Sequence, residues 1–211
     1  MMKHLIVTLL CTTFSAQCAE KILIRPAQAK DIDDLNVLSI KQYHNDFKPL
    51  WEKFYKPLFP AIDPEQFVKE KTELNNQKNK SIILDNNVDK PLRLLVAEIQ
   101  DAESLKPKIA GFCRFEKLNE TTMYGHFIIV DEDFRKQGIA KQLAFAAMNT
   151  FPDVTTCKFR AQIHNKAINE IYLKHGCIQK RLVSISLDTG AINTDQSAPI
   201  THYDYEYIIK K

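Results

Sequence analysis

The chain has 211 residues, of which 45% are hydrophobic and 26% are charged, so it can form one globular domain around one core. This composition argues against long disorder, a collagen-like chain or a coiled coil. Lys and Arg number 29 against 26 Asp and Glu, a net charge of +3. Nucleic-acid binding needs a clustered basic face, and so small and dispersed a surplus does not indicate nucleic acid as an obligatory partner.

Residues 1–19 have the layout of a secretory signal peptide. A short basic start is followed by about ten mostly apolar residues, Leu5 to Phe14, and then by small and polar residues up to Ala19. The apolar run is too short for a stable membrane span. We therefore expect a signal peptide over 1–19 and one domain over 20–211. The location is exported, periplasmic or secreted, if the signal is real, and cytoplasmic if the segment is instead an uncleaved extension packed as a strand or helix.

The cysteines favour packing over a disulfide framework or a metal site. Cys11 and Cys18 lie in the expected signal, and Cys113, Cys157 and Cys177 are spread through apolar segments without zinc-site spacing. We expect them to be small buried hydrophobic residues, and we expect no metal site. If the chain is exported, one disulfide is an alternative, and the sequence does not indicate which two cysteines would form it.

In chain order, the first half predicts a strand at 21–25 and an amphipathic helix at 31–45, because apolar residues recur there on one side of a helical wheel. An aromatic run at 47–59 contains prolines that limit it to short helical pieces. A polar helix follows at 65–79. The remaining elements of this half are strands, at 93–99, 109–115 and 122–130, the first two of which read as a hairpin.

The second half predicts a helix at 137–151, stopped by Pro152, and an alternating strand at 156–164. A helix at 165–175 follows, with Gly176 placed where a helix C-terminus favours glycine. Two closing strands are predicted at 182–187 and 202–209. The order of strands and helices predicts an α/β domain with a mixed sheet.

The segment from Val130 to Lys141 is the most informative one. A strand ends at Val130 and a helix opens near Gln137, so the unpaired first N–H groups of the helix favour an anion there. Gly138 and Ala140 keep side-chain bulk away from the backbone, and nearby basic residues add positive charge. This favours a pyrophosphate cradle, although an ordinary helix start with a solvated basic turn has the same pattern. The acidic stretch 131–133 reads as a solvent-facing turn.

Two motifs resemble those of the GNAT superfamily of acyl-CoA N-acyltransferases. Arg135-x-x-Gly138-x-Ala140 is similar to its R/Q-x-x-G-x-G/A signature. The segment 165–177 resembles its N-x-x-A-x-x-x-Y-x-K-x-G-F pattern, with Asn165, Tyr172, Lys174 and Gly176 in register. Ile168 and Cys177 replace the usual Ala and Phe. The resemblance covers about 21–211 and implies a mostly antiparallel central sheet with one splayed parallel strand pair, flanked by helices.

The resemblance also implies an acyl-CoA site. The strand before the signature would offer backbone groups to the pantetheine arm, and the following turn would hold the pyrophosphate. Asn165 of the second motif would bond the pantetheine or support the separation of the two parallel strands. In chain order the implied binding residues are Ile128, Ile129, Val130, Arg135, Lys136, Gln137, Gly138, Ile139, Ala140, Lys141, Asn165 and Tyr172.

The mechanism that the resemblance implies is direct attack of an amine on the thioester, so that positioning supplies most of the catalysis. Tyr172 is the candidate general acid toward the leaving thiolate, with core packing as the alternative. His126 alternates with Ile128 and Val130 on the strand that enters the cleft, which makes it a candidate base; a hydrogen-bonded sheet histidine is the alternative. Glu98 and Glu116 are weaker candidates. The aromatic run at 47–59 is either packing or a lid over the acceptor.

The leading hypothesis is therefore transfer of an acetyl group from acetyl-CoA to a primary amine of a small molecule or a protein. The alternative is an exported, non-catalytic module that keeps the fold and binds acyl-CoA or a partner, because acetyl-CoA is a cytoplasmic metabolite. A secreted transferase that meets acetyl-CoA after delivery to a host is a third hypothesis.

Overall fold

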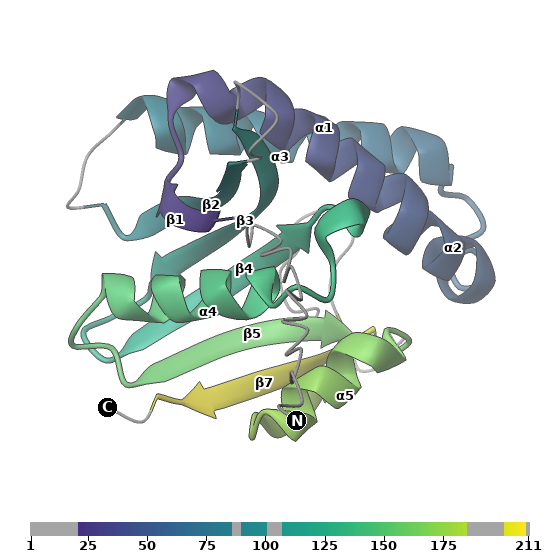
Figure 1. Ribbon diagram of the computed structural model, residues 1–211. Helices are drawn as coiled ribbons and strands as arrows, with labels where there is room; N and C mark the ends of the chain where they lie inside the picture. The colour runs from purple at the N-terminus through teal and green to yellow at the C-terminus, as the bar shows by residue number, and fades with distance from the viewer. Residues whose placement is uncertain (1–20, 86–89, 101–106, 185–200, 210–211) are drawn as a thin grey trace, which may run out of the picture.

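The computed structural model describes residues 21–85, 90–100, 107–184 and 201–209 (Figure 1). The expected signal peptide at 1–19 and the second half of the strand expected at 182–187 lie outside those ranges. Within them, no helix combines the length and the apolar character that crossing a membrane requires.

Seven strands form one sheet in the order β1-β2-β3-β4-β5-β7-β6. β4 and β5 are parallel, and every other neighbouring pair is antiparallel. This confirms the predicted mixed, mostly antiparallel sheet with one parallel pair. The strands are β1 (Lys21–Pro26), β2 (Leu92–Gln100), β3 (Lys108–Lys117), β4 (Thr122–Val130), β5 (Thr156–Gln162), β6 (Ile178–Val183) and β7 (His202–Ile208).

The longer helices cover the two faces of the sheet. They are α1 (Ile32–Gln42), α3 (Pro64–Asp85), α4 (Ile139–Thr150) and α5 (Lys166–Lys174). α1 continues through a π-helical turn, η2 (Tyr43–Phe47), then α2 (Lys48–Leu50) and a second π-helical turn, η3 (Trp51–Tyr55). Two short 3₁₀ turns, η1 (Ala29–Asp31) and η4 (Glu132–Phe134), precede α1 and follow β4. The aromatic run is thus helical up to Tyr55 as a continuation of α1, whereas its prolines predict separate short pieces; Pro57 and Pro60 lie beyond the end of this helix.

The core consists of two layers. On one face, α4 packs through Ile139, Leu143 and Ala147 against residues of β2, β3 and β4 such as Phe115 and Met123. On the opposite face, α1 and α3 pack against the strands in a second cluster, which includes Leu35, Leu38, Ile83, Val96, Phe112 and Ile129. The central strands β2 to β4 are therefore buried on both sides, which explains why their sequences are nearly continuous apolar runs.

The structure corrects one strand boundary. β6 lies at Ile178–Val183, whereas the sequence predicts a strand at 182–187. The exposed positions from Ile178 to Leu182 hide this strand from a hydrophobicity argument, because β6 is an edge strand with little to bury. Gly176 has a φ of +80°, which confirms its predicted role at the end of α5.

Candidate functional site

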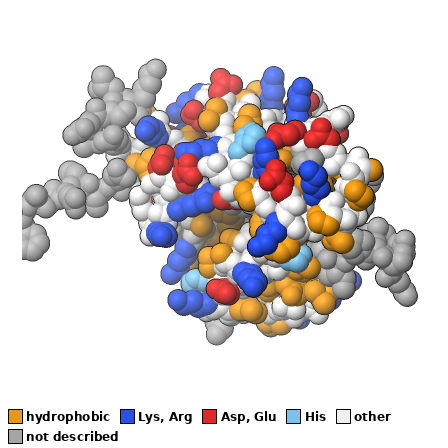
Figure 2. All heavy atoms as spheres, turned by 90° about the vertical axis from the view of Figure 1, so that its right-hand side faces the viewer, with side chains coloured by type: hydrophobic (Ala, Val, Ile, Leu, Met, Phe, Trp, Pro, Cys, Tyr) orange, Lys and Arg blue, Asp and Glu red, His pale blue; other side chains and the backbone are white. Residues whose placement is uncertain are grey.

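The parallel strands β4 and β5 separate halfway along their length. Their pairing runs from Thr122–Thr156 to Gly125–Phe159 and stops there, although β4 continues to Val130 and β5 to Gln162. Figure 1 shows the two strand ends diverging at the right of the molecule. Figure 2 looks onto that end, where the surface is hollowed near its middle and Lys and Arg side chains gather beside the hollow. Backbone groups of 126–130 on the edge toward β5 therefore have no strand partner within the described ranges.

A β-bulge accompanies the separation. Arg114 of β3 pairs with Phe127, but the next residue, Phe115, pairs with Gly125, so His126 is an extra residue in β4. A bulge bends the strand that carries it and increases its local twist. The bend lies at the level where β4 leaves β5, and it therefore gives a local cause for the splay.

The turn from β4 into α4 leaves the start of the helix open. Gly138 is the N-cap residue of α4 with a φ of +80°, and Lys136 has a φ of +65°. A Cβ built on Gly138 would meet nothing within 4 Å, so the left-handed backbone, not a lack of room, requires glycine. The surroundings of that Cβ position at the N-cap are thus open, and the first helical N–H groups of α4 favour an anion. Together with the flanking lysines, this turn fits a pyrophosphate group, which supports the predicted cradle.

Arg135 turns away from that cradle toward η2. Its two terminal nitrogens donate to the Asp46 carboxylate at 3.0 and 2.7 Å, and its Nε donates to the Val130 carbonyl at 3.1 Å. The hydrogen bonds to Asp46 also raise the pKa of Arg135. Arg135 thus joins η2 to the end of β4 and shapes the turn that carries the cradle.

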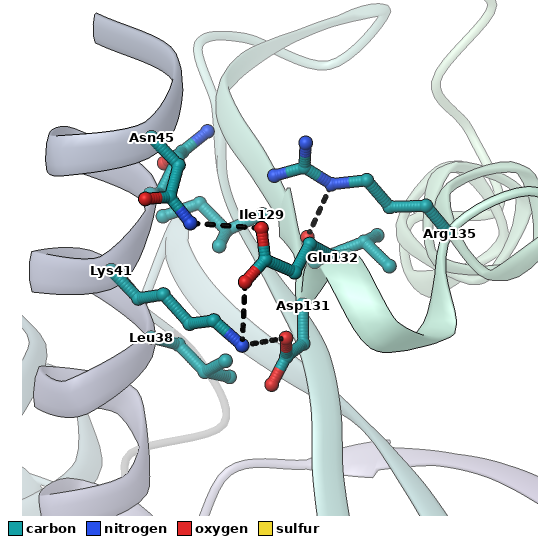
Figure 3. A pocket seen from close by; sticks show the side chains of 9 residues that line it. Leu38, Lys41, Asn45, Ile129, Asp131, Glu132 and Arg135 are labelled. Carbon is teal, nitrogen blue, oxygen red and sulfur yellow. Dashed lines mark hydrogen bonds and ion pairs between the residues drawn. The ribbon is translucent and has the colours of Figure 1, made fainter. Parts of the chain in front are cut away.

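A pocket lies between α1 and this turn (Figure 3). The Lys41 ammonium contacts the carboxylates of Asp131, Glu132 and Asp133 at 2.6, 3.2 and 3.4 Å. Asn45 donates to Glu132 at 2.9 Å. The acidic stretch is therefore not a simple solvated turn, because it anchors α1 to the end of β4, and only Asp133 keeps a mostly exposed side chain, at 72%.

Tyr172 of α5 lies where the two strands separate. Its ring contacts the ring of Phe159, the last β5 residue paired with β4, at a centroid distance of 4.4 Å, and that of Tyr205 at 5.3 Å. Burial raises the pKa of Tyr172 to about 12. Its hydroxyl makes no hydrogen bond to any residue that the structure describes. The hydroxyl is thus protonated at neutral pH and is not needed for internal bonding.

Asn165 caps the helix that carries Tyr172. Its side-chain oxygen accepts a hydrogen bond from the backbone N–H of Ile168 at 3.3 Å. This is a standard N-cap contact, and it fixes the start of α5. The resemblance implied a contact to pantetheine or support of the splay, and the observed geometry favours the supporting role.

His126 forms a pair with Glu116 of β3. Its Nε2 lies 3.0 Å from a Glu116 carboxylate oxygen, and its ring lies 5.1 Å from that of Tyr124. Burial, and secondarily the Arg114 cation, lower the pKa of His126, with the Glu116 hydrogen bond acting in the opposite direction. The ring is therefore neutral at pH 7. If its Nε2–H donates to Glu116, its Nδ1 is free to accept a proton.

The bulge also changes the face on which His126 lies. Simple alternation would place it with Ile128 and Val130, and Val130 packs against the α4 core. Phe115 belongs to that same core, so its neighbour Glu116 projects to the opposite face, and its partner His126 does so too. The alternation argument for His126 is wrong because one extra residue breaks the period of two.

The other candidates of the sequence analysis have structural partners. Glu98 is bound by Arg25, which also binds Asp31, near the outer edge of the sheet.

Trp51 lies buried between other rings of the aromatic run and Phe67, so most of the run is packing. Phe54 stacks on His164 at 4.0 Å and connects η3 to the loop after β5. Across the described ranges, no three His, Cys, Asp or Glu side chains gather as metal ligands would.

The comparisons with known proteins agree with this geometry. The family model described as "Acetyltransferase (GNAT) family" matches residues 49–177. Among curated proteins, no sequence matches the chain. Similar solved structures include PaiA N-acetyltransferase from Thermoplasma acidophilum in complex with coenzyme A, with a TM-score of 0.63 and 16% identity over 90% of this chain and 99% of that one.

Two further structures illustrate the breadth of the similarity. NAA60 from Arabidopsis thaliana in complex with a bisubstrate analogue has a TM-score of 0.53 at 16% identity, covering 90% of this chain and 100% of that one. RimL, a ribosomal L7/L12 α-N-protein acetyltransferase in complex with coenzyme A, has a TM-score of 0.56 at 16% identity, covering 89% of this chain and 94% of that one. At such identities these neighbours show the fold, whereas the family model covers more than half of the chain; the chain belongs to the GNAT acetyltransferase family.

Proposed function

We propose that the protein transfers an acetyl group from acetyl-CoA to a primary amine by direct attack, without a covalent enzyme intermediate. The observation that carries the proposal is the separation of β4 and β5 after Gly125 and Phe159, between the open start of α4 and the Tyr172 ring. The family membership supports it independently. The neighbours in complex with coenzyme A or a bisubstrate analogue support the same pair of substrates.

The donor would lie along the open edge of β4 with its pyrophosphate at the start of α4. The backbone of Ile128 to Val130 would pair with the pantetheine arm, and the N–H groups from Lys136 to Lys141 would bind the pyrophosphate. Arg135, held by Asp46, would shape the cradle, and Asn165 would hold α5 in place. Acetyl-CoA supplies an electrophilic thioester carbonyl to this site.

In the reaction, the amine nitrogen bonds to the carbonyl carbon, the carbon–sulfur bond breaks, and its electron pair leaves with sulfur. The nitrogen's surplus proton passes to Nδ1 of His126, directly or through water. The Tyr172 hydroxyl donates a hydrogen bond to the sulfur. With a pKa of about 12 against about 8.5 for a thiol, full proton transfer is uphill by about 5 kcal/mol, so Tyr172 stabilises the thiolate and solvent protonates it.

A pair of glycine variants tests the donor site. Gly138 and Gly176 share a φ of +80° and open space around the built Cβ, so the same substitution strains both turns alike. Gly138→Glu would place a carboxylate in the cradle, and the dissociation constant for coenzyme A should rise at least tenfold, about 1.4 kcal/mol. Gly176→Glu should leave it within about twofold. Isothermal titration calorimetry measures both constants.

Thiol release from acetyl-CoA over a panel of amines then separates an enzyme from a binding module. Equal coenzyme A affinity in both folded variants contradicts the cradle. Tight binding of coenzyme A without thiol release over any amine contradicts the transferase and supports the non-catalytic alternative.

A further inference from the structure

The β5–β7–β6 part of the sheet has one apolar face and one charged face. Phe159 and Tyr205 stack on each other and contact Tyr172 on the α5 side. Since side chains alternate along strands, Arg160 and Asp204, one residue away, project to the other side of the sheet. That face carries four basic side chains, Lys158, Arg160, Lys180 and Arg181, against two acidic ones, Asp204 and Glu206.

Three of these residues form a cluster across three strands. The Nε of Arg160 donates to one oxygen of Asp204 at 2.7 Å, and the Nε of Arg181 donates to the other at 2.8 Å. No residue in the described ranges accepts a hydrogen bond from the terminal nitrogens of either guanidinium. Because two cations share one carboxylate, the Arg160–Asp204–Arg181 cluster keeps a charge of +1. Lys180, by contrast, is paired with Glu206 at 3.2 Å.

The cluster is suited to hold a second anion. A guanidinium offers a planar fork of donors that matches carboxylate and phosphate oxygens. Asp204 fixes both arginines through Nε and so leaves both forks available. The arginines differ in exposure, at 24% for the Arg160 side chain and 61% for that of Arg181. A ligand can therefore reach the cluster from solvent through Arg181.

The cluster also lies beside the separation of β4 and β5. Arg160 is the first β5 residue beyond the last pair, Gly125–Phe159. Its Cζ lies 5.7 Å from the Tyr124 ring centroid, which lies 5.1 Å from the His126 ring centroid. Arg160 and the candidate base are therefore within about 11 Å of each other. A small molecule can span that distance.

We propose that the acceptor carries a carboxylate or phosphate group besides its amine, and that Arg160 and Arg181, fixed by Asp204, bind this anion while the amine lies near His126. The inference rests on the proposed transferase function and adds the substrate class. It assigns Asp204 as a positioning residue and the two arginines as acceptor-binding residues.

The test of specificity uses matched amines. Thiol release is measured with glycine, 4-aminobutyrate and 6-aminohexanoate against their amides, and with phosphoethanolamine against ethanolamine. At least one anionic amine should exceed its neutral partner tenfold or more in kcat/KM, and the pair that does so tells carboxylate from phosphate. In Arg181→Gln that ratio should fall at least tenfold, because the KM for the anionic amine rises. Lys180→Gln, which removes a neighbouring but paired cation of the same strand, should preserve the ratio.

A binding measurement keeps the inference testable without turnover. The ¹⁵N Nε–H resonances of arginine are followed while glutarate or inorganic phosphate is titrated into the full chain. Saturable shifts of two arginine signals, lost in Arg181→Gln and kept in Lys180→Gln, support the anion site even if coenzyme A binding fails. Equal use of neutral and anionic amines, or the absence of a saturable shift, overturns it.

Discussion

The sheet has two parts that meet at the β4–β5 pair, and they differ in how their faces are used. β1 to β4 are covered by α4 on one face and by α1 and α3 on the other, and their central residues form the two core clusters. β5, β7 and β6 have α5 and an aromatic cluster on one face and charged side chains on the other. The first part is built for burial, and the second keeps polar groups close to the separation.

This difference in burial between the two parts of the sheet indicates where the reacting side chains can lie. A face buried between helices has no room for a substrate, so reacting groups must come from the margin between the two parts. His126 reaches that margin through the bulge in β4, and Tyr172 reaches it from α5. Substitutions in the first part should therefore act mainly on stability, and substitutions at the margin mainly on turnover.

The largest expected effect is that of Tyr172→Phe. Its hydroxyl makes no hydrogen bond within the described ranges, so stability should change by less than about 0.5 kcal/mol. Turnover should fall roughly 10²–10³-fold, because the hydroxyl donates its hydrogen bond only as sulfur gains charge. Tyr205→Phe is the matched control, since Tyr205 donates to Asn169 at 2.8 Å in the same aromatic cluster. It should lose about 1 kcal/mol of stability and keep most of the turnover.

Chemical denaturation and steady-state thiol release measure both variants. A Tyr172→Phe protein with near-normal turnover on a verified acceptor would show that the tyrosine only packs.

His126 should appear in the pH dependence. The fraction of an acceptor with an amine pKa of about 10 that is free base rises tenfold per pH unit, which gives kcat/KM a slope of 1. Burial lowers the pKa of His126 below 6.5, and below that pKa the histidine gains a proton and stops acting as a base. The logarithmic slope should therefore increase from 1 to 2 somewhere below pH 6.5.

His126→Gln should keep a slope of 1 over the whole range and reduce kcat/KM at pH 7 by about 10–100-fold. An unchanged profile in this variant would exclude His126 as the base. The same profile measured for Glu116→Gln tests whether the carboxylate orients the ring.

Gly111→Ala should destabilise the first part of the sheet. A Cβ on Gly111 would lie 2.6 Å from the Ile129 carbonyl oxygen, so β3 and β4 would have to move apart. We expect a loss of about 2 kcal/mol in the free energy of unfolding. Gly125→Ala is the control, because its nearest contact, at 3.8 Å, is ordinary. A Gly111→Ala protein as stable as the control would contradict the close approach of the two strands.

The smallest expected effect is that of Asp46→Asn. It removes the carboxylate that holds the Arg135 guanidinium, so the cradle should become less ordered. Because the pair is exposed, we expect only a two- to threefold weaker affinity for coenzyme A. Calorimetry at low and high salt should show the difference shrinking as salt screens the charges. A tenfold loss would mean that Arg135 contacts the donor directly.

The sequence predicts local features well. The helix start, predicted near Gln137 and observed with Gly138 as the N-cap, and the end of α5 at Gly176 both depend on nearby residues. The His126–Glu116 pair was missed because it depends on strand register, which a bulge shifts by one residue. The partners of Arg135 and Arg160 lie 89 and 44 residues away, and only the folded chain brings them together. The edge strand β6 was misplaced because it buries little.

The parallel pairing of β4 with β5, called the parallel seam below, also affects how the molecule unfolds locally. Only four residue pairs, from Thr122–Thr156 to Gly125–Phe159, connect β4 to β5, whereas the antiparallel ladders on either side are longer. Local unfolding follows weak boundaries, so we expect β5, β6, β7 and α5 to open as one unit and to exchange their amide protons separately from β1–β4. A donor bound along the seam would bridge both units. It should slow exchange in strands that it does not touch, and couple two otherwise independent opening events into one.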